Sequence, residues 1–223
     1  MKKILIALTS HDDLAGLRRT GYYLPEVAHP WRVFTDAGYE VDLVSVAGGE
    51  PPMDGADLSD PVQRAFTEDP RMRAALAATP RFADVDPAAY DAVLFAGGHG
   101  TMWDFPHDRD LQSVARAVAE QGGVVAAVCH GPAALVGVTL ADGRPLVAGK
   151  EVAAFTDDEE EAAGLTAHVP FLLQTRLEEL GAHHTAAPPF EPHVVTDGRL
   201  VTGQNPASAT GVAQAVLEVL QTA

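Results

Sequence analysis

Short runs of apolar residues recur along the chain, and they restrict the possible folds more than any other feature of the sequence. Each run is followed by turn residues, and in most of them the apolar residues are consecutive rather than alternating with polar ones. Consecutive apolar residues are typical of strands covered on both faces, as in parallel sheets. We therefore predict four buried parallel strands: Lys3–Leu8, Glu40–Val46, Ala92–Ala96 and Val124–Val128.

Amphipathic stretches separate these runs and are predicted to be helices. Glycines at 38 and at 122–123 suit helix C-termini. Strands alternating with helices predict an α/β fold with a mostly parallel central sheet and helices on both faces. The 223 residues contain no internal repeat or linker, so we expect a single domain over 1–223. The predicted helices are Glu26–Ala37, Asp60–Ala78, Asp110–Gln121, one around His168–Leu180, and Ala207–Leu220; further strands are expected at Val152–Phe155, His193–Val195 and Leu200–Thr202.

Charge and cysteine content limit the partners and the compartment. The chain has 15 Lys and Arg residues and 31 Asp and Glu residues, so its net charge is −16. This charge repels nucleic acids and anionic membranes. The apolar run Ile4–Leu8 is too short for a signal peptide, and no segment approaches the roughly 18 apolar residues of a membrane span. A single cysteine excludes an intrachain disulfide, so we expect a cytoplasmic protein.

That cysteine, Cys129, is the candidate nucleophile. It follows the predicted strand Val124–Val128 and precedes His130-Gly131-Pro132, a sequence suited to a sharp turn into a helix. The positive end of such a helix would favour the thiolate, and the His130 N–H would be placed to stabilise an oxyanion. The alternative is a buried structural cysteine. The strand, the histidine and the Gly-Pro pair together favour the catalytic interpretation.

A second turn follows the neighbouring strand at Gly97-Gly98-His99-Gly100. Since the carboxyl ends of parallel strands share one edge of the sheet, this turn and Cys129 are expected to lie together. The turn lacks the spacing of a phosphate-binding loop. It supplies either a second oxyanion donor or only a tight turn. The aromatic residues after it, Trp103 and Phe105, with His107, either wall a pocket or pack the turn.

Three motifs together resemble the ThiJ/PfpI superfamily, the class I glutamine amidotransferase-like group. They are Ala127-Val-Cys-His-Gly-Pro132, Phe95-Ala-Gly-Gly-His-Gly-Thr-Met-Trp-Asp104 and Thr202-Gly-Gln-Asn-Pro-Ala-Ser208. The similarity covers nearly the whole chain and is greatest to the heat-shock-chaperone branch, also called glyoxalase III. This resemblance implies a flavodoxin-like three-layer sandwich and a homodimer.

The resemblance also implies roles for individual residues. Cys129 matches the family nucleophile and His130 the adjacent histidine of a Cys-His-acid triad. The acid follows a Phe-Thr-Asp-x-x-Glu pattern, which here begins at Phe155 and places Glu160 in the triad. Five carboxylates run from 157 to 161, so Asp157 and Glu159 are alternatives. From the residues alone, this run is a solvated helix N-terminus.

Glu26 matches the family glutamate that contacts the cysteine, although a glutamate after Pro25 is otherwise an ordinary residue of a first helical turn. A carboxyl beside a thiolate in a partly desolvated pocket is expected to have a raised pKa, as a general acid and base requires. The N–H groups of Gly98 and His130 are expected to bind the oxyanion and the substrate.

The resemblance implies a glutathione-independent glyoxalase, a cofactor-independent lyase of the D-lactate dehydratase type. Methylglyoxal or a related 2-oxoaldehyde would form a hemithioacetal with Cys129 and leave as lactate or another 2-hydroxy acid. The alternatives are a stress-related holding chaperone, a cysteine peptidase or amidase of the same superfamily, and an oxidative-stress sensor at Cys129. The histidines His11 (beside Asp12 and Asp13) and His183-His184 lack a zinc-binding spacing, so no metal is predicted.

Overall fold

The computed structural model describes residues 2–222 and is built around one six-stranded sheet in the order β11-β12-β8-β7-β1-β5. Neighbouring strands run parallel except β11, which is antiparallel to β12. The prediction of an α/β fold with a mostly parallel sheet is therefore confirmed. The strands are β1 (Lys3–Leu8), β5 (Glu40–Ser45), β7 (Ala92–Phe95), β8 (Val124–Val128), β11 (Val194–Asp197) and β12 (Leu200–Gly203).

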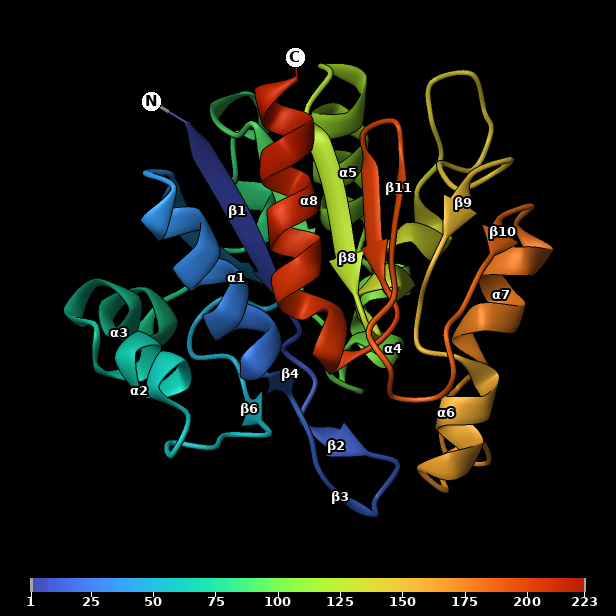
Figure 1. Cartoon of the computed structure of the whole chain (residues 1–223), viewed down its shortest axis with the longest axis horizontal. Helices are drawn as coiled ribbons and strands as arrows, with labels where there is room; N and C mark the ends of the chain where they lie inside the picture. The colour runs from blue at the N-terminus through green and yellow to red at the C-terminus, as the bar shows by residue number, and fades with distance from the viewer. Residues whose placement is uncertain (1, 223) are drawn as a thin grey trace.

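Both faces of the sheet are buried, as the apolar runs predict. In β1, Ile4, Ile6 and Leu8 belong to one apolar core, whereas Leu5 and Ala7 belong to the other. Helices α1 and α8 pack against each other and cover the first face, while α5 covers the second (Figure 1). No helix within residues 2–222 is long and apolar enough to cross a bilayer. The longer helices are α1 (Pro25–Asp36), α2 (Pro61–Glu68), α3 (Pro70–Ala77), α5 (Arg109–Glu120) and α8 (Ala209–Gln221).

Short elements gather beyond the carboxyl ends of the strands, and Figure 1 shows β2, β3, β4, β6 and α4 on that side of the molecule. The short strands are β2 (Asp13–Leu14), β3 (Arg18–Arg19), β4 (Tyr22–Tyr23), β6 (Met53–Asp54), β9 (Glu151–Val152) and β10 (His183–His184). The short helices are α4 (Thr101–Asp104), α6 (Asp157–Ala162) and α7 (Leu173–Glu179). The 3₁₀ segments are η1 (Phe82–Asp84), η2 (Pro87–Ala89), η3 (Phe105–His107), η4 (Gly131–Gly137) and η5 (Pro206–Ser208).

Prolines account for two differences from the predicted helices. The stretch 60–78 is two helices because Asp69, which precedes Pro70, is extended and caps α3 through the N–H groups of Arg71 and Met72. The helix expected around 168–180 begins only at Leu173, beyond Pro170. The strand expected at 152–155 is the two-residue β9, after which the chain turns toward the sheet edge that holds Cys129.

Candidate active site

Cys129 lies on a sharp corner immediately after β8. Its φ is 60°, a left-handed value that only a few per cent of non-glycine residues adopt. The corner is held on both sides, because the Cys129 N–H donates to the Gly203 carbonyl at 2.9 Å and its carbonyl accepts from the Phe155 N–H at 2.9 Å. This strand-to-turn corner has the backbone shape expected of a nucleophile elbow.

The segment after the corner differs from the expected helix. Residues Gly131–Gly137 form the 3₁₀ segment η4, with Pro132 in its first turn. Seven residues of 3₁₀ geometry supply a weaker aligned dipole than an α-helix of several turns. The state of the Cys129 thiol is therefore set by the side chains around it.

The first of these side chains is Glu26, in the first turn of α1. It is fully buried, and its Oε2 accepts the Gly97 N–H at 2.8 Å. A Cβ at residue 97 would collide with that oxygen, which explains the glycine. Burial raises the pKa of Glu26 to about 8, against the opposing hydrogen bonds from Cys129 and Gly97. The carboxyl therefore carries a proton at neutral pH.

The Cys129 thiol and the Glu26 carboxyl titrate as a pair. Burial raises the pKa of the thiol, and an ionised Glu26 raises it further, whereas the His130 N–H directed at the sulfur lowers it. Two adjacent buried negative charges repel each other strongly, so the thiolate can form only while Glu26 is protonated. This pairing places a protonated carboxyl beside the sulfur.

His130 and Glu160 continue the arrangement on the other side of the sulfur. The His130 Nδ1 lies 3.3 Å from the Cys129 Sγ, and its Nε2 lies 2.8 Å from the Glu160 Oε2. Burial lowers the pKa of His130 to about 4, with a further decrease from His99, although Glu160 opposes both. Burial would raise the pKa of Glu160, but hydrogen bonds from His130 and His99 outweigh it and hold the value at about 2. A neutral imidazole therefore lies between a thiol and a carboxylate.

The capping of α6 explains why Glu160, and not its neighbours, reaches His130. Thr156 caps the helix by accepting the Glu159 N–H at 3.0 Å, and the Glu159 Oε2 accepts the Thr156 N–H at 2.9 Å. Glu159 is thereby turned toward the Phe190 N–H and the Asn205 amide, at 2.7 and 2.9 Å. Of the three acids considered, only Glu160 contacts the histidine.

The expected oxyanion donors lie at the same edge of the sheet. Gly98 lines the cavity above Cys129 with a φ of 101°, and a Cβ there would collide with the Gly21 carbonyl. Within residues 2–222, its N–H donates to no protein acceptor. The Gly98 N–H is thus available to an oxygen bound next to the sulfur, toward which the His130 N–H also points.

His99 is a site residue that sequence reasoning did not single out. It follows Gly98, its Nε2 lies 2.9 Å from the Glu160 Oε1, and its ring centroid lies 4.0 Å from that of His130. Glu160 therefore bridges two histidines. The signal was present in the Gly-Gly-His-Gly turn, but nothing local shows that its histidine shares an acid 61 residues away.

His99, His130 and Glu160 also form a cluster that could hold a metal ion. The ligand atoms of His99, His130 and Glu160 lie within 4.8 Å of one another. Both nitrogens that face Glu160 are already hydrogen bonded to it, so a cation would have to displace two protons. The histidines considered from the sequence lie elsewhere: His11 contacts the Asp13 carbonyl, and His184 accepts the Ala154 N–H.

A cavity of about 450 Å³ opens above Cys129. Phe190 stands at its mouth with 54% of its surface exposed and a φ of 65°. Trp103, Phe105 and His107 are not among the lining residues, and Phe105 is fully buried under the turn. Besides the residues already described, the lining consists of Arg18, Tyr23, Asp54, Gly55, Phe155 and Pro206.

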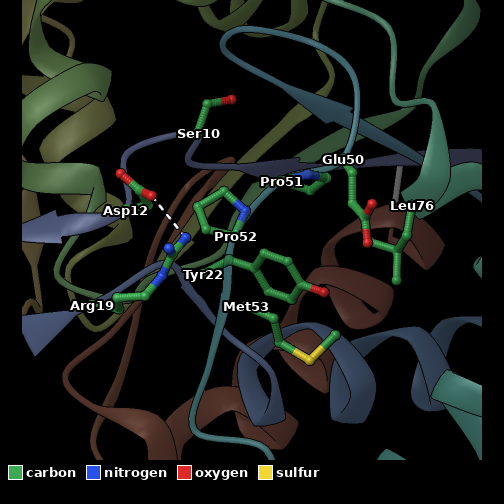
Figure 2. Close-up of a pocket in the computed structure, with 9 residues that line it drawn as sticks. All are labelled: Ser10, Asp12, Arg19, Tyr22, Glu50, Pro51, Pro52, Met53 and Leu76. Atoms are coloured by element: carbon green, nitrogen blue, oxygen red, sulfur yellow. Dashed lines mark hydrogen bonds and ion pairs between the residues drawn. The ribbon is translucent and has the colours of Figure 1, made fainter.

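A second cavity of about 430 Å³ is lined by residues of the β4–β6 pair and of neighbouring segments, and Figure 2 shows these lining residues. Tyr22 and Met53 line it, whereas their chain neighbours Tyr23 and Asp54 line the cavity of Cys129. Successive residues of a strand point to opposite faces, so two short strands separate the cavities. Cys129 and Glu26 belong to the first cavity alone, which makes it the candidate active site.

The profile of the DJ-1/PfpI family matches residues 17–219. The chain belongs to the DJ-1/PfpI family. Two curated relatives match it over nearly their full lengths. "Glyoxalase 3" of Candida albicans is 34% identical over 99% of both chains. A glutathione-independent glyoxalase of Saccharomyces cerevisiae is 36% identical over 99% of this chain and 98% of its own.

Solved structures of this DJ-1/PfpI fold agree with the present one. The Rapid Encystment Protein of Francisella tularensis superposes with a TM-score of 0.95 at 38% identity, over 99% of both chains. Glyoxalase III from Candida albicans superposes with a TM-score of 0.86 at 33% identity, over 98% of this chain and 97% of that one. The flavodoxin-like sandwich that the motifs imply is therefore the observed architecture.

Proposed function

We propose that this DJ-1/PfpI protein is a glutathione-independent glyoxalase that converts methylglyoxal or a related 2-oxoaldehyde to the 2-hydroxy acid. One observation carries the proposal: a fully buried Glu26, whose pKa is about 8, lies against the only cysteine. The conversion needs a nucleophile and one group that removes and returns a proton at neighbouring carbons. A carboxyl that titrates near neutrality beside a thiol meets both requirements.

The first steps join substrate and enzyme. The Cys129 sulfur attacks the aldehyde carbon, C1, and the thiol proton passes to the His130 Nδ1. Glu26 gives its proton to the former aldehyde oxygen, which the N–H groups of Gly98 and His130 stabilise as it gains charge. The product is a hemithioacetal, and Glu26 is left as a carboxylate.

The next steps move the proton between the two carbons. The Glu26 carboxylate removes the hydrogen from C1, and His130 protonates the oxygen on C2, which gives an enediol. Glu26 then protonates C2 and regains a proton from the hydroxyl on C1, which leaves a 2-hydroxyacyl thioester on Cys129. C1 is oxidised while C2 is reduced, so the reaction requires no redox cofactor. Water releases the 2-hydroxy acid.

The site and the charge of the chain favour a small neutral substrate. Side chains of Tyr23, Phe155 and Phe190 are among those that line the cavity of about 450 Å³. Such a cavity suits a small carbonyl compound better than an extended peptide. The net charge of −16 disfavours nucleic acids and anionic membranes. We further propose a homodimer and a cytoplasmic location, on the family resemblance and the single cysteine.

The test is lactate formed from methylglyoxal without glutathione, with wild type beside Cys129→Ala. We expect lactate from wild type and none from the variant, because no other thiol is present in the chain. Lactate from neither protein would contradict the glyoxalase function and favour the peptidase, amidase or sensor alternatives. Suppression of aggregation by Cys129→Ala in that case would identify a holding chaperone, which needs no nucleophile.

A further inference from the structure

We propose that His99 is the general base that delivers water to the thioester on Cys129. The inference rests on the proposed function and assigns its last step, the hydrolysis, to a residue outside the Cys129-His130-Glu160 arrangement. Glyoxalase chemistry leaves the substrate covalently attached to sulfur after the proton transfer. Some group must then activate a water molecule. The positions of His99 and His130 differ, and this difference indicates which histidine does so.

The two histidines differ in their exposure to solvent. The His130 side chain is 1% exposed, whereas the His99 side chain is 15% exposed. Both line the cavity of Cys129, but His130 contacts the sulfur itself through its Nδ1 at 3.3 Å. His99 is therefore the ring more accessible to water in the cavity, whereas His130 lies against the sulfur that carries the acyl group.

Glu160 determines which nitrogen of His99 is free. This carboxylate, whose pKa is held at about 2, accepts hydrogen bonds only, so the His99 Nε2 at 2.9 Å must carry the hydrogen. In the neutral ring, the Nδ1 then holds a lone pair. Within residues 2–222, the His99 Nδ1 has no hydrogen-bond partner and is not among the buried unpaired atoms. It is an open acceptor on a ring that lines the cavity.

The other basic groups are occupied at this stage. The Nδ1 of His130 faces the sulfur, and Glu26 holds the proton that the sulfur needs when it leaves. Glu26 lines the same cavity, but a carboxyl that already carries its proton cannot accept another from water. His99 is therefore the cavity-facing base that remains.

Hydrolysis takes place at the thioester carbon, C1. A C1–O bond forms from water, and one water proton passes to the His99 Nδ1. The C1–S bond breaks, the sulfur takes the proton of Glu26, and the new carboxylic acid restores that proton to Glu26 as it ionises. His99 releases its proton to solvent through the cavity. The net products are the 2-hydroxy acid anion, one proton, and the enzyme with its thiol restored.

His99→Gln is the informative variant, because the glutamine amide can still donate to Glu160 but has no basic nitrogen. With methylglyoxal, we expect the adduct on Cys129 to form at nearly the wild-type rate in a single turnover. Steady-state lactate formation is expected to fall about 10²–10⁴-fold, the usual contribution of a general base. Intact-mass spectrometry should then show the adduct accumulating in the variant and not in wild type.

Hydroxylamine identifies the trapped species, while adduct formation at nearly the wild-type rate shows that the variant is folded. It cleaves a thioester to a hydroxamate without a general base, whereas a hemithioacetal merely reverses on dilution. Because hydroxylamine also consumes free methylglyoxal as the oxime, it is added after excess substrate has been removed, and we expect His99→Gln then to release hydroxamate and regain its free thiol. Two results would overturn the proposal: lactate formation at the wild-type rate, or adduct formation slowed as much as turnover, which would make His99 a positioning residue for Glu160. Absence of lactate from wild type would instead refute the glyoxalase function itself.

Discussion

Cys129 and Glu26 both occupy positions that are unfavourable for folding. Cys129 adopts a left-handed φ of 60°, which costs about 1–2 kcal/mol for a residue with a Cβ. Glu26 is an ionisable group with no exposed surface. Within residues 2–222, one of its oxygens, Oε1, has no hydrogen-bond partner. Unfavourable features of this kind persist where function requires them. Their coincidence at one point of the fold supports Cys129 and Glu26 as the reacting pair.

The buried carboxyl gives a pH-dependent stability that can be measured. The pKa of Glu26 is raised from 4.5 to about 8, so the unfolded chain ionises at a lower pH than the folded one. Wild-type stability should therefore fall by about 1 kcal/mol per pH unit from this group as the pH rises from 5 to 8, with no such loss below pH 4.5. Glu26→Gln removes the effect.

Thermal unfolding of wild type and Glu26→Gln across that pH range checks the expectation. The difference in Tm should grow in favour of the variant toward pH 8. Glu161→Gln, at an exposed position of α6, controls for the loss of one carboxylate. A Tm difference that is constant with pH would mean that Glu26 ionises normally in the folded protein.

Among the elements of the fold, the short helix α6 positions two parts of the site. Its capping box orients Glu160 toward His130 and His99, and it turns Glu159 toward the Phe190 loop. Phe190 then stands at the mouth of the cavity beside Phe155, with ring centroids 6.3 Å apart. One short helix therefore connects the acid of the site with its aromatic wall.

Loss of the cap should affect stability and activity together. Thr156→Ala is expected to lower the free energy of unfolding by about 1 kcal/mol, the usual value of an N-cap, and to lower lactate formation because Glu160 loses its orientation. Thr156→Ser keeps the hydroxyl and should retain both. Urea unfolding and steady-state assays measure the pair of effects. Full activity in Thr156→Ala would show that the cap does not position Glu160.

The buried strands could be predicted from the sequence because their signal is local. Runs such as Val124–Val128 are apolar throughout, and the sheet buries them on both faces. The helix expected over 60–78 was wrong because the Asp69-Pro70 break outweighed a continuous amphipathic pattern. Two-residue strands such as β4 and β6 leave no periodic signal, since they pair only through tertiary contacts.

The residues of the site likewise fall into those with a local sequence signal and those without one. Cys129, Gly98 and His130 follow strands that periodicity identifies, so their meeting at one sheet edge could be expected. Glu160 came from the family resemblance, because an acidic run has the same composition whether solvated or buried. His99 and Phe190 needed the structure, since their importance depends on Glu160 and Glu159, which are distant in sequence.

At the scale of the whole molecule, the acidic surface agrees with the chemistry proposed. A 2-oxoaldehyde is uncharged, so a net charge of −16 does not hinder its approach. The product is an anion, which the same field repels from the protein. The charge therefore disfavours polyanionic partners while it permits substrate entry and favours product release.

Proton transfer by Glu26 is tested by lactate formation from methylglyoxal by Glu26→Gln, measured beside wild type, with alkylation of Cys129 by iodoacetamide in both. We expect the variant to be alkylated but to make no lactate, because glutamine cannot carry a proton from C1 to C2. Lactate formation at the wild-type rate by Glu26→Gln would contradict this role of Glu26.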